Sequence, residues 1–336
     1  MPLTPPQISR KPLFWVVLAA CCIATACSTT NTAQSPPSSS SATTQSNANI
    51  SQLGESERQI LSDFADKVII PTYEKFAGHA GALSTALEAL AQNPTPETLK
   101  AAQNAWVTAR SSWEQSECFA FGPAYSLGYD GQLDTWPIND TDLKKVLDDT
   151  TALTPESVEK LQDSQKGFHV IEYILFGDAK NKALETFTPR EYEYLQALGK
   201  DFSRVATALA TSWKQGADGQ PAYREVIAKA GEKDNSTYPT VQAGAEEIVN
   251  GMADSLDEVA NEKLGAPFTE KDPKGLESRF SQNTLADIKH NLQGAKNVYL
   301  GSFPDANTSG MGLNTHIAKV NPELDTKLKS QFEAAS

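Results

Sequence analysis

Apolar residues recur every three or four positions in nearly every segment after residue 55, a spacing typical of α-helices that bury one face. Ile60, Phe64, Val68 and Ile69 are the first residues to show it. No run of residues alternates between apolar and polar side chains, as a half-buried β-strand would. The sequence therefore predicts an all-α protein.

Helix start and stop signals divide this pattern into separate helices. Thr95-Pro96 and Thr188-Pro189 are expected helix N-termini, because threonine caps a helix and proline suits its first position. Residues 124–140 are expected to form a loop. The helices are expected at about 55–71, 73–92, 96–118, 155–177, 189–213, 239–264 and 282–300, with a last one from 322. We expect two helical-bundle domains packed side by side, 53–182 and 183–336.

The N-terminal residues predict export and attachment to a membrane. Arg10 and Lys11 precede a short apolar run, and Ala24-Thr25-Ala26-Cys27 is similar to a lipobox, so residues 1–26 are expected to be a lipoprotein signal peptide and Cys27 the acylated residue. The alternative is ordinary cleavage after small residues, with a spare cysteine. Residues 27–52 are rich in Ser, Thr and Asn, and we expect a disordered tether. Cys118 then has no disulfide partner.

Charge narrows the classes of ligand. After cleavage, 27 basic residues (29 − 2) stand against 42 acidic ones, a net charge of −15. This excess argues against nucleic acid as a partner and limits membrane contact to the lipid anchor, whereas a metal cation would be attracted. We expect the chain in the cell envelope, facing the periplasm, with the outer membrane as its favoured location.

The segment Gly167-Phe168-His169-Val170-Ile171-Glu172 places an imidazole and a carboxylate three residues apart. On a helix, Glu172 lies in an apolar stripe with Leu161, Phe168 and Leu175, and His169 lies at its edge. A carboxylate in such surroundings needs a cation, a hydrogen-bond donor or a proton. Gly167, unfavourable inside a helix, predicts close approach by another backbone or a ligand.

The expected helix 96–118 carries a second set of charges on an apolar face, namely Arg110, Glu114 and Glu117, beside Trp106 and Trp113. One interpretation is an internal Arg110–Glu114 pair with Glu117 in solvent. The other is a metal site in which Glu114, Glu117, His169 and Glu172 are ligands, with Asp134 from the intervening loop as a fifth. Imidazole with several carboxylates suits iron, zinc or manganese.

These residues give the sequence its resemblance to the imelysin family of bacterial envelope proteins. The stretches that carry it are 110–117, Phe121-Gly122-Pro123, Leu133-Asp134-Thr135-Trp136-Pro137, the Gly-x-His-x-x-Glu signature at 167–172, and 280–301. The resemblance implies two helical bundles with a site at their interface. We expect this site to be lined also by Gly167, Arg110, Trp106, Trp113 and Trp136. The resemblance also implies that Glu114, Glu117 and Asp134 align with acidic ligands proposed in a related periplasmic component of ferrous-iron uptake. Family members continue beyond this length, so the second bundle is expected to lack a helix.

The resemblance implies an envelope lipoprotein that binds a metal ion, iron before zinc, in iron uptake or homeostasis, with iron-transport components as partners. A metallopeptidase of imelysin type is one alternative, although Tyr173 stands where the inverted zincin motif has its second histidine. A module for haem or polysaccharide, with Arg110, Trp106 and Trp113 as its surface, is another. A last alternative has no ligand, with His169 and Glu172 bonded to Arg110 and Trp113.

Overall fold

The computed structural model describes residues 54–335, and these confirm the all-α prediction. Their only strands are β1 (Ser302–Phe303) and β2 (Thr308–Ser309), which pair antiparallel. No described helix is both long and apolar enough to cross a membrane. The expected signal peptide, the tether and Cys27 lie outside the described residues.

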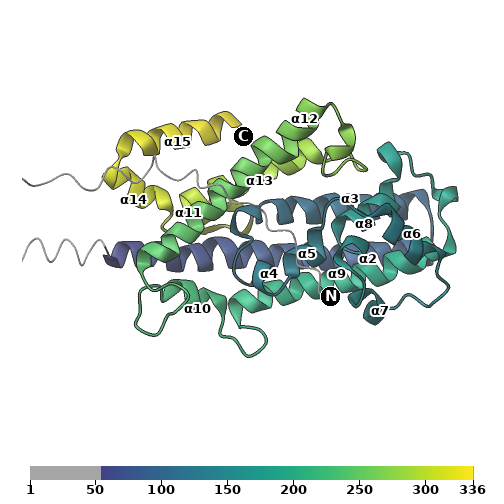
Figure 1. Cartoon of the computed structure of the whole chain (residues 1–336), viewed down its shortest axis with the longest axis horizontal. Helices are drawn as coiled ribbons and strands as arrows, with labels where there is room; N and C mark the ends of the chain where they lie inside the picture. The colour runs from purple at the N-terminus through teal and green to yellow at the C-terminus, as the bar shows by residue number, and fades with distance from the viewer. Residues whose placement is uncertain (1–53, 336) are drawn as a thin grey trace, which may run out of the picture. The chain divides into compact units, whose positions relative to one another are not determined.

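Helices follow one another along the chain (Figure 1). After a helical stretch at 54–63, the α-helices are α2 (Ile70–Gln92), α3 (Pro96–Glu114), α4 (Pro123–Ser126), α5 (Tyr129–Asp134), α6 (Asp140–Asp148), α7 (Pro155–Glu159), α8 (Phe168–Phe176), α9 (Pro189–Lys214), α10 (Tyr223–Ala228), α11 (Val241–Glu258), α12 (Ala266–Glu270), α13 (Thr284–Leu300), α14 (Leu313–Val320) and α15 (Pro322–Ala335). Two segments are π-helical, η1 (Phe64–Ile69) and η6 (Val259–Gly265). The 3-10 turns are η2 (Glu117–Phe119), η3 (Asp163–Gln165), η4 (Asp178–Lys180), η5 (Leu184–Thr186), η7 (Pro273–Gly275) and η8 (Pro304–Ala306).

The predicted N-caps are confirmed. The Thr95 hydroxyl accepts from the Thr98 backbone N–H at 3.2 Å, and the Thr188 hydroxyl accepts from that of Glu191 at 3.2 Å. Glu191 Oε2 in turn accepts from the Thr188 N–H at 2.7 Å, which completes a capping box. These local bonds explain why the starts of α3 and α9 could be predicted from the sequence.

The expected break at Pro71 is wrong, because the helix runs on from η1 into α2. Pro71 has no N–H to bond the Lys67 carbonyl, four residues earlier. That carbonyl instead accepts from the Thr308 hydroxyl at 2.6 Å. A distant side chain thus bonds a carbonyl of η1 beside Pro71.

The single helix expected over 155–177 is two helices, α7 and α8, separated at residues 160–167. Gly167 caps α8 with φ of +82°, and a Cβ there would lie 2.5 Å from the Leu133 carbonyl oxygen. The close approach predicted at Gly167 is therefore by the backbone of Leu133. Leu161 lies within this break and therefore does not share a helical stripe with Glu172. The expected loop 124–140 likewise contains α4 and α5, and Asp134 is the last residue of α5.

Two groups of helices make up the described fold. In the first, α2 lies between α3 and α9, and α8 packs on both of these (Figure 1). The second group contains α11 to α15, with α13 in contact with α11, α14 and α15. The boundary predicted at residue 183 therefore falls within the first group, because α9 packs along α2. The change of partners comes after α9.

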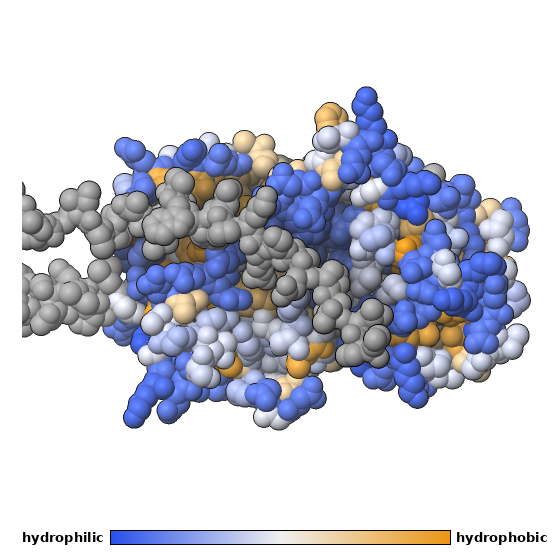
Figure 2. Space-filling view, in the orientation of Figure 1, coloured by the Kyte–Doolittle hydropathy of each residue, from blue (hydrophilic) through white to orange (hydrophobic). Residues whose placement is uncertain are grey.

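The two groups meet where α3 ends. A Cβ on Gly294 of α13 would lie only 2.3 Å from the Gln115 carbonyl oxygen, so glycine allows α13 to press against this turn. Side chains from both groups join one buried core. The face shown in Figure 2 is mainly hydrophilic with small apolar patches, as expected when helices turn their apolar stripes inward. The junction is where the buried charges gather.

Candidate functional site

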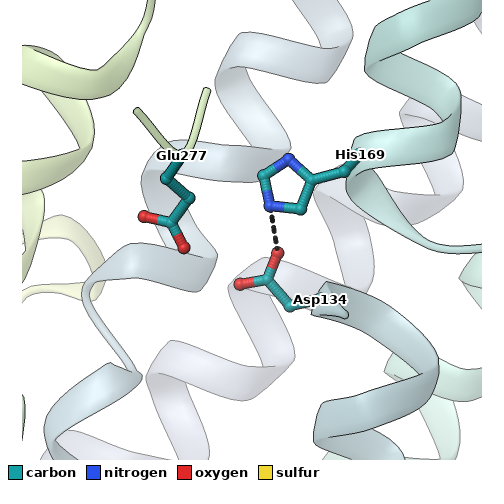
Figure 3. Close-up of side chains that lie close together, drawn as sticks. All are labelled: Asp134, His169 and Glu277. Atoms are coloured by element: carbon teal, nitrogen blue, oxygen red, sulfur yellow. Dashed lines mark ion pairs between the residues drawn. The ribbon is translucent and has the colours of Figure 1, made fainter. Parts of the chain in front are cut away.

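Buried ionisable side chains converge at this junction from both groups of helices. The first group contributes Arg110, Glu114, Glu117, Asp134, His169 and Glu172, and the second contributes Lys263, Glu277 and Asp287. We call these nine residues the junction cluster. Figure 3 shows how Asp134, His169 and Glu277 turn toward one another.

His169 is held through both ring nitrogens. Its Nδ1 lies 3.0 Å from Glu172 Oε2, and its Nε2 lies 3.1 Å from Asp134 Oδ1. Trp136 packs beside the ring with centroids 4.6 Å apart. Burial alone would lower the pKa of His169, but the bonds to Asp134 and Glu172 raise that pKa to about 9. The imidazole is therefore protonated at neutral pH.

Glu172 is fully buried, and donors from a distant segment satisfy it. Its Oε1 accepts from the Ser281 backbone N–H at 2.8 Å and from the Ser281 hydroxyl at 2.7 Å. Its other oxygen holds His169. Glu172 thus joins α8 to the segment before α13, and the need for a partner that its sequence position indicates is met within the protein.

Arg110 lies fully buried among four carboxylates. It pairs with Glu114 and Asp134, approaches Glu277 at 3.0 Å and Asp287 at 3.9 Å, and lies over the Phe168 ring. These acids raise the pKa of Arg110 despite a burial effect that acts the other way. The predicted Arg110–Glu114 pair is present. Glu117, however, is not in solvent, since its side chain is 13% exposed.

Asp134 lies at the centre of the hydrogen bonds. It accepts from Arg110 Nη1 through Oδ1 and from the Trp113 indole N–H at 2.6 Å through Oδ2, and its Oδ1 also lies 3.1 Å from His169 Nε2. Burial would raise the pKa of Asp134, but Arg110 and His169 hold it well below its usual range. In the ligand-free alternative, His169 and Glu172 were expected to bond Arg110 and Trp113. In the structure, Asp134 is the residue that bonds both Arg110 and Trp113.

Lys263 is the second buried cation. Its Nζ lies 3.0 Å from Glu277 Oε2, 3.6 Å from Glu114 Oε2 and 3.9 Å from Glu117 Oε2. Burial acts to lower the pKa of Lys263, but the effect of these acids is larger, and the pKa lies well above its ordinary value. The ammonium is therefore charged and lies among three acids.

Acid exceeds base in the junction cluster. Six carboxyl groups stand against three bases, Arg110, Lys263 and His169, an excess of three. Burial raises the pKa of Glu114 to about 8 and that of Glu117 well above its ordinary value. Protons on these two acids reduce the excess, and a bound cation could replace them.

Two sets of side chains have the geometry for a metal. One is Asp134, His169 and Glu277, and the other is Glu114, Glu117 and Asp134; in each set the ligand atoms lie within 4.8 Å of one another. The donor chemistry, carboxylates with at most one imidazole, fits iron, zinc or manganese. Among the described residues, the buried Oδ1 of Asn291, whose amide nitrogen bonds Glu114, has no hydrogen-bond partner. The residues therefore fit a cation.

The predicted site residues do not all meet. His169, Glu114, Glu117 and Asp134 fall in the two sets, whereas Glu172 falls in neither. Arg110, Trp113 and Trp136 contact the cluster. Trp106 does not, because its indole N–H donates to the Phe168 carbonyl at 3.0 Å within the core. Gly167 allows the backbone of Leu133 to approach closely, because it has no side chain.

Four residues of the second group were missed: Lys263, Glu277, Ser281 and Asp287. Ser281 lies in a stretch that carries the family resemblance, so a signal for it was present. Lys263 lies at the end of the expected helix 239–264, where a lysine indicates a solvent-exposed position, and Glu277 lies in the following segment rich in proline, glycine and charge. Both reach the cluster only by contacting residues of the first group that lie more than 100 positions earlier in the sequence.

Comparisons with known proteins agree with this architecture. A sequence model of the imelysin family matches residues 69–336. Iron-regulated protein A of Synechococcus elongatus is 43% identical over 277 residues, which cover 82% of this chain and 73% of that protein. A crystal structure described as an iron-regulated protein A precursor from Parabacteroides distasonis has a TM-score of 0.75 at 26% identity, covering 84% of this chain and 85% of that one. An imelysin-like protein from Psychrobacter arcticum shares the fold, with a TM-score of 0.64 at 15% identity over 84% and 82% of the two chains.

Proposed function

The chain belongs to the imelysin family, and from that premise we propose that it binds a metal cation, iron foremost, at the junction cluster, in iron uptake or homeostasis. One observation carries the proposal. Asp134 of α5, His169 of α8 and Glu277 of the turn between η7 and α13 bring their ligand atoms within 4.8 Å of one another. The name of the Synechococcus relative, iron-regulated protein A, supports iron as the metal.

Residues of the junction cluster would have different roles in metal binding. Glu172 holds Nδ1 of His169 and so directs Nε2 toward Asp134, in the manner of a carboxylate that orients a metal-bound histidine. Asp134, His169 and Glu277 would be ligands. Glu114 and Glu117 would complete the set through Asp134, which both sets share. Glu172, first expected to be a ligand, becomes the residue that positions one.

Binding would release protons. The protonated imidazole of His169 forms an ion pair with Asp134, 3.1 Å from Nε2, and it must lose its Nε2 proton before that nitrogen can bind a cation. Glu114 and Glu117, with raised pKa values, would lose theirs as the cation supplies positive charge. The cluster would thus exchange protons for metal.

We also propose that the protein is held at the envelope by acylated Cys27, with the outer membrane favoured and iron-transport components as partners. The lipobox-like Ala24-Thr25-Ala26-Cys27 supports this. Mass spectrometry of the mature N-terminus would test it. A diacylglyceryl group on Cys27, and release of a Cys27→Ala variant from membranes, are expected; an unmodified Cys27 would contradict the proposal.

Metal content tests the main proposal. Residues 28–336, purified without chelators and titrated with Fe²⁺ under anaerobic conditions or with Zn²⁺, should bind about one ion per chain. His169→Gln should lose most of this binding. His290→Gln is the matched control, because His290 lies half-buried on α13 outside both metal sets. Equal metal content in wild type and His169→Gln would overturn the proposal.

A further inference from the structure

Lys263 is placed where a bound cation would also lie. It belongs to η6, the π-helical turn between α11 and α12, and its residue is 6% exposed. Its Nζ lies 3.0 Å from Glu277, which belongs to one metal set, and 3.6 and 3.9 Å from Glu114 and Glu117, which belong to the other. One ammonium therefore contacts acids of both sets.

Lysine and metal would compete for the same oxygens. A lysine ammonium only donates hydrogen bonds and cannot be a ligand, so it adds positive charge beside a cation without contributing a bond to it. Two positive charges a few ångströms apart repel strongly in a poorly hydrated site. Arg110 is fully buried and lies over the Phe168 ring, whereas Lys263 is 6% exposed and approaches Glu117, whose side chain is 13% exposed.

Glu258 offers Lys263 another partner. It lies at the end of α11, five residues before Lys263, with Oε1 4.0 Å from Nζ and its side chain 45% exposed. Glu258 belongs to neither metal set. A small rotation of the lysine side chain toward Glu258 would carry the ammonium away from Glu277 while keeping it beside an acid. Single π-helical turns recur at functional positions, and η6 holds Lys263 at such a turn.

We propose that Lys263 is a tethered cation that occupies the junction cluster before metal binds, moves toward Glu258 when metal arrives, and thereby sets the metal affinity. This inference rests on the proposed function. It assigns Lys263 as an affinity-determining residue and the 258–263 segment as the part of the chain that responds to metal.

The first test compares Zn²⁺ affinity of the 28–336 protein and its variants. Lys263→Met should bind at least about tenfold more tightly, because a nearby charge that repels the metal is removed. Lys263→Arg, which keeps the charge, should stay near wild type. Lys182→Met is the matched control, since Lys182 is also a largely buried lysine, 2.5 Å from Glu191, but outside the cluster. Unchanged or weaker binding by Lys263→Met would overturn the inference.

The second test uses the wild-type protein, so it does not depend on a variant that folds. An amine-acylating reagent is applied with and without saturating Zn²⁺, and each lysine is followed by peptide mass spectrometry. Acylation of Lys263 should rise at least about fivefold with metal as the side chain leaves the buried site, while that of Lys182 stays constant. A Lys263 that remains protected in metal-saturated protein would contradict the inference.

The two tests separate this inference from the proposed function. If wild type and Lys263→Met both bind Zn²⁺ with equal affinity, only the role of Lys263 fails. If neither binds Zn²⁺ or Fe²⁺, the proposed function fails and this inference fails with it.

Discussion

Glu172 and Ser281 are joined by two hydrogen bonds, since one carboxylate oxygen of Glu172 accepts from both the backbone N–H and the hydroxyl of Ser281. The two residues are 109 positions apart in sequence. The other oxygen of Glu172 holds His169. The second half of the His-x-x-Glu signature therefore both connects two groups of helices and orients the imidazole.

Truncation of Glu172 should therefore cost stability. Glu172→Ala leaves the buried Ser281 N–H unsatisfied and leaves the Ser281 hydroxyl only the Ser278 carbonyl at 3.4 Å; an unsatisfied buried donor costs about 1–3 kcal/mol, so the free energy of unfolding should fall clearly. Urea denaturation measures it. Glu88→Ala on α2, which removes a 41% exposed carboxylate 3.7 Å from Lys200, is the control and should change little. A Glu172→Ala protein as stable as wild type would contradict the role of this contact.

Arg110 should be the most costly residue of the cluster to replace. Arg110→Met leaves Glu114, Asp134 and Glu277 without their shared cation, and loss of one partner from a buried ion pair costs about 3–5 kcal/mol. Arg224→Met, which removes a 45% exposed arginine paired with Asp66, should cost less than about 1 kcal/mol. Chemical denaturation compares the two variants, and equal losses would argue against a compensating role for Arg110.

Stability of the metal-free protein should fall as the pH rises. The pKa of His169 is raised from its ordinary 6.5 to about 9, so folding favours the protonated ring. This contribution is complete below pH 6.5 and is lost as the pH rises through about 9. Glu114, whose pKa is raised to about 8, acts in the same direction at lower pH. Urea midpoints between pH 6 and pH 9.5 should fall in wild type and fall less in His169→Gln; equal slopes would contradict the assignment.

Trp106 should contribute to the stability of the fold and not to metal affinity. Its indole N–H bonds the Phe168 carbonyl in the core, so Trp106→Phe should lower the free energy of unfolding by about 1–3 kcal/mol. Zn²⁺ affinity should stay within about twofold of wild type, because Trp106 contributes no ligand atom to either metal set. A large loss of metal binding in a folded Trp106→Phe protein would place this residue at the site after all.

What could be predicted from the sequence was mostly local. The starts of α3 and α9 follow from Thr95 and Thr188, whose caps involve neighbouring residues only. The helical spacing likewise indicated the fold class. By contrast, the helix that continues through Pro71 is contacted there by Thr308, and Gly167 at the start of α8 is contacted by the backbone of Leu133. Neither contact leaves a periodic trace in the sequence.

The site residues also fall into those that could be predicted from local sequence and those that depend on distant contacts. Asp134, Glu114, Glu117 and His169 were predicted together, and the structure brings them together. The shared stripe assumed for Glu117 was wrong, because α3 ends at Glu114 and Glu117 lies in the 3-10 turn η2. Glu277 and Lys263 reach the cluster only through the docking of the second helix group. Charge balance at a site built from two distant segments cannot be judged from either segment alone.

The position of a bound metal tests the central claim most directly. Anomalous diffraction at the iron or zinc edge from metal-loaded crystals of residues 28–336 would locate the ion. We predict one peak within bonding distance of His169 Nε2 and of carboxylate oxygens of Asp134 and Glu277. An ion bound elsewhere, or a metal-saturated protein in which His169 keeps its bond to Asp134 and bears no metal, would contradict the account.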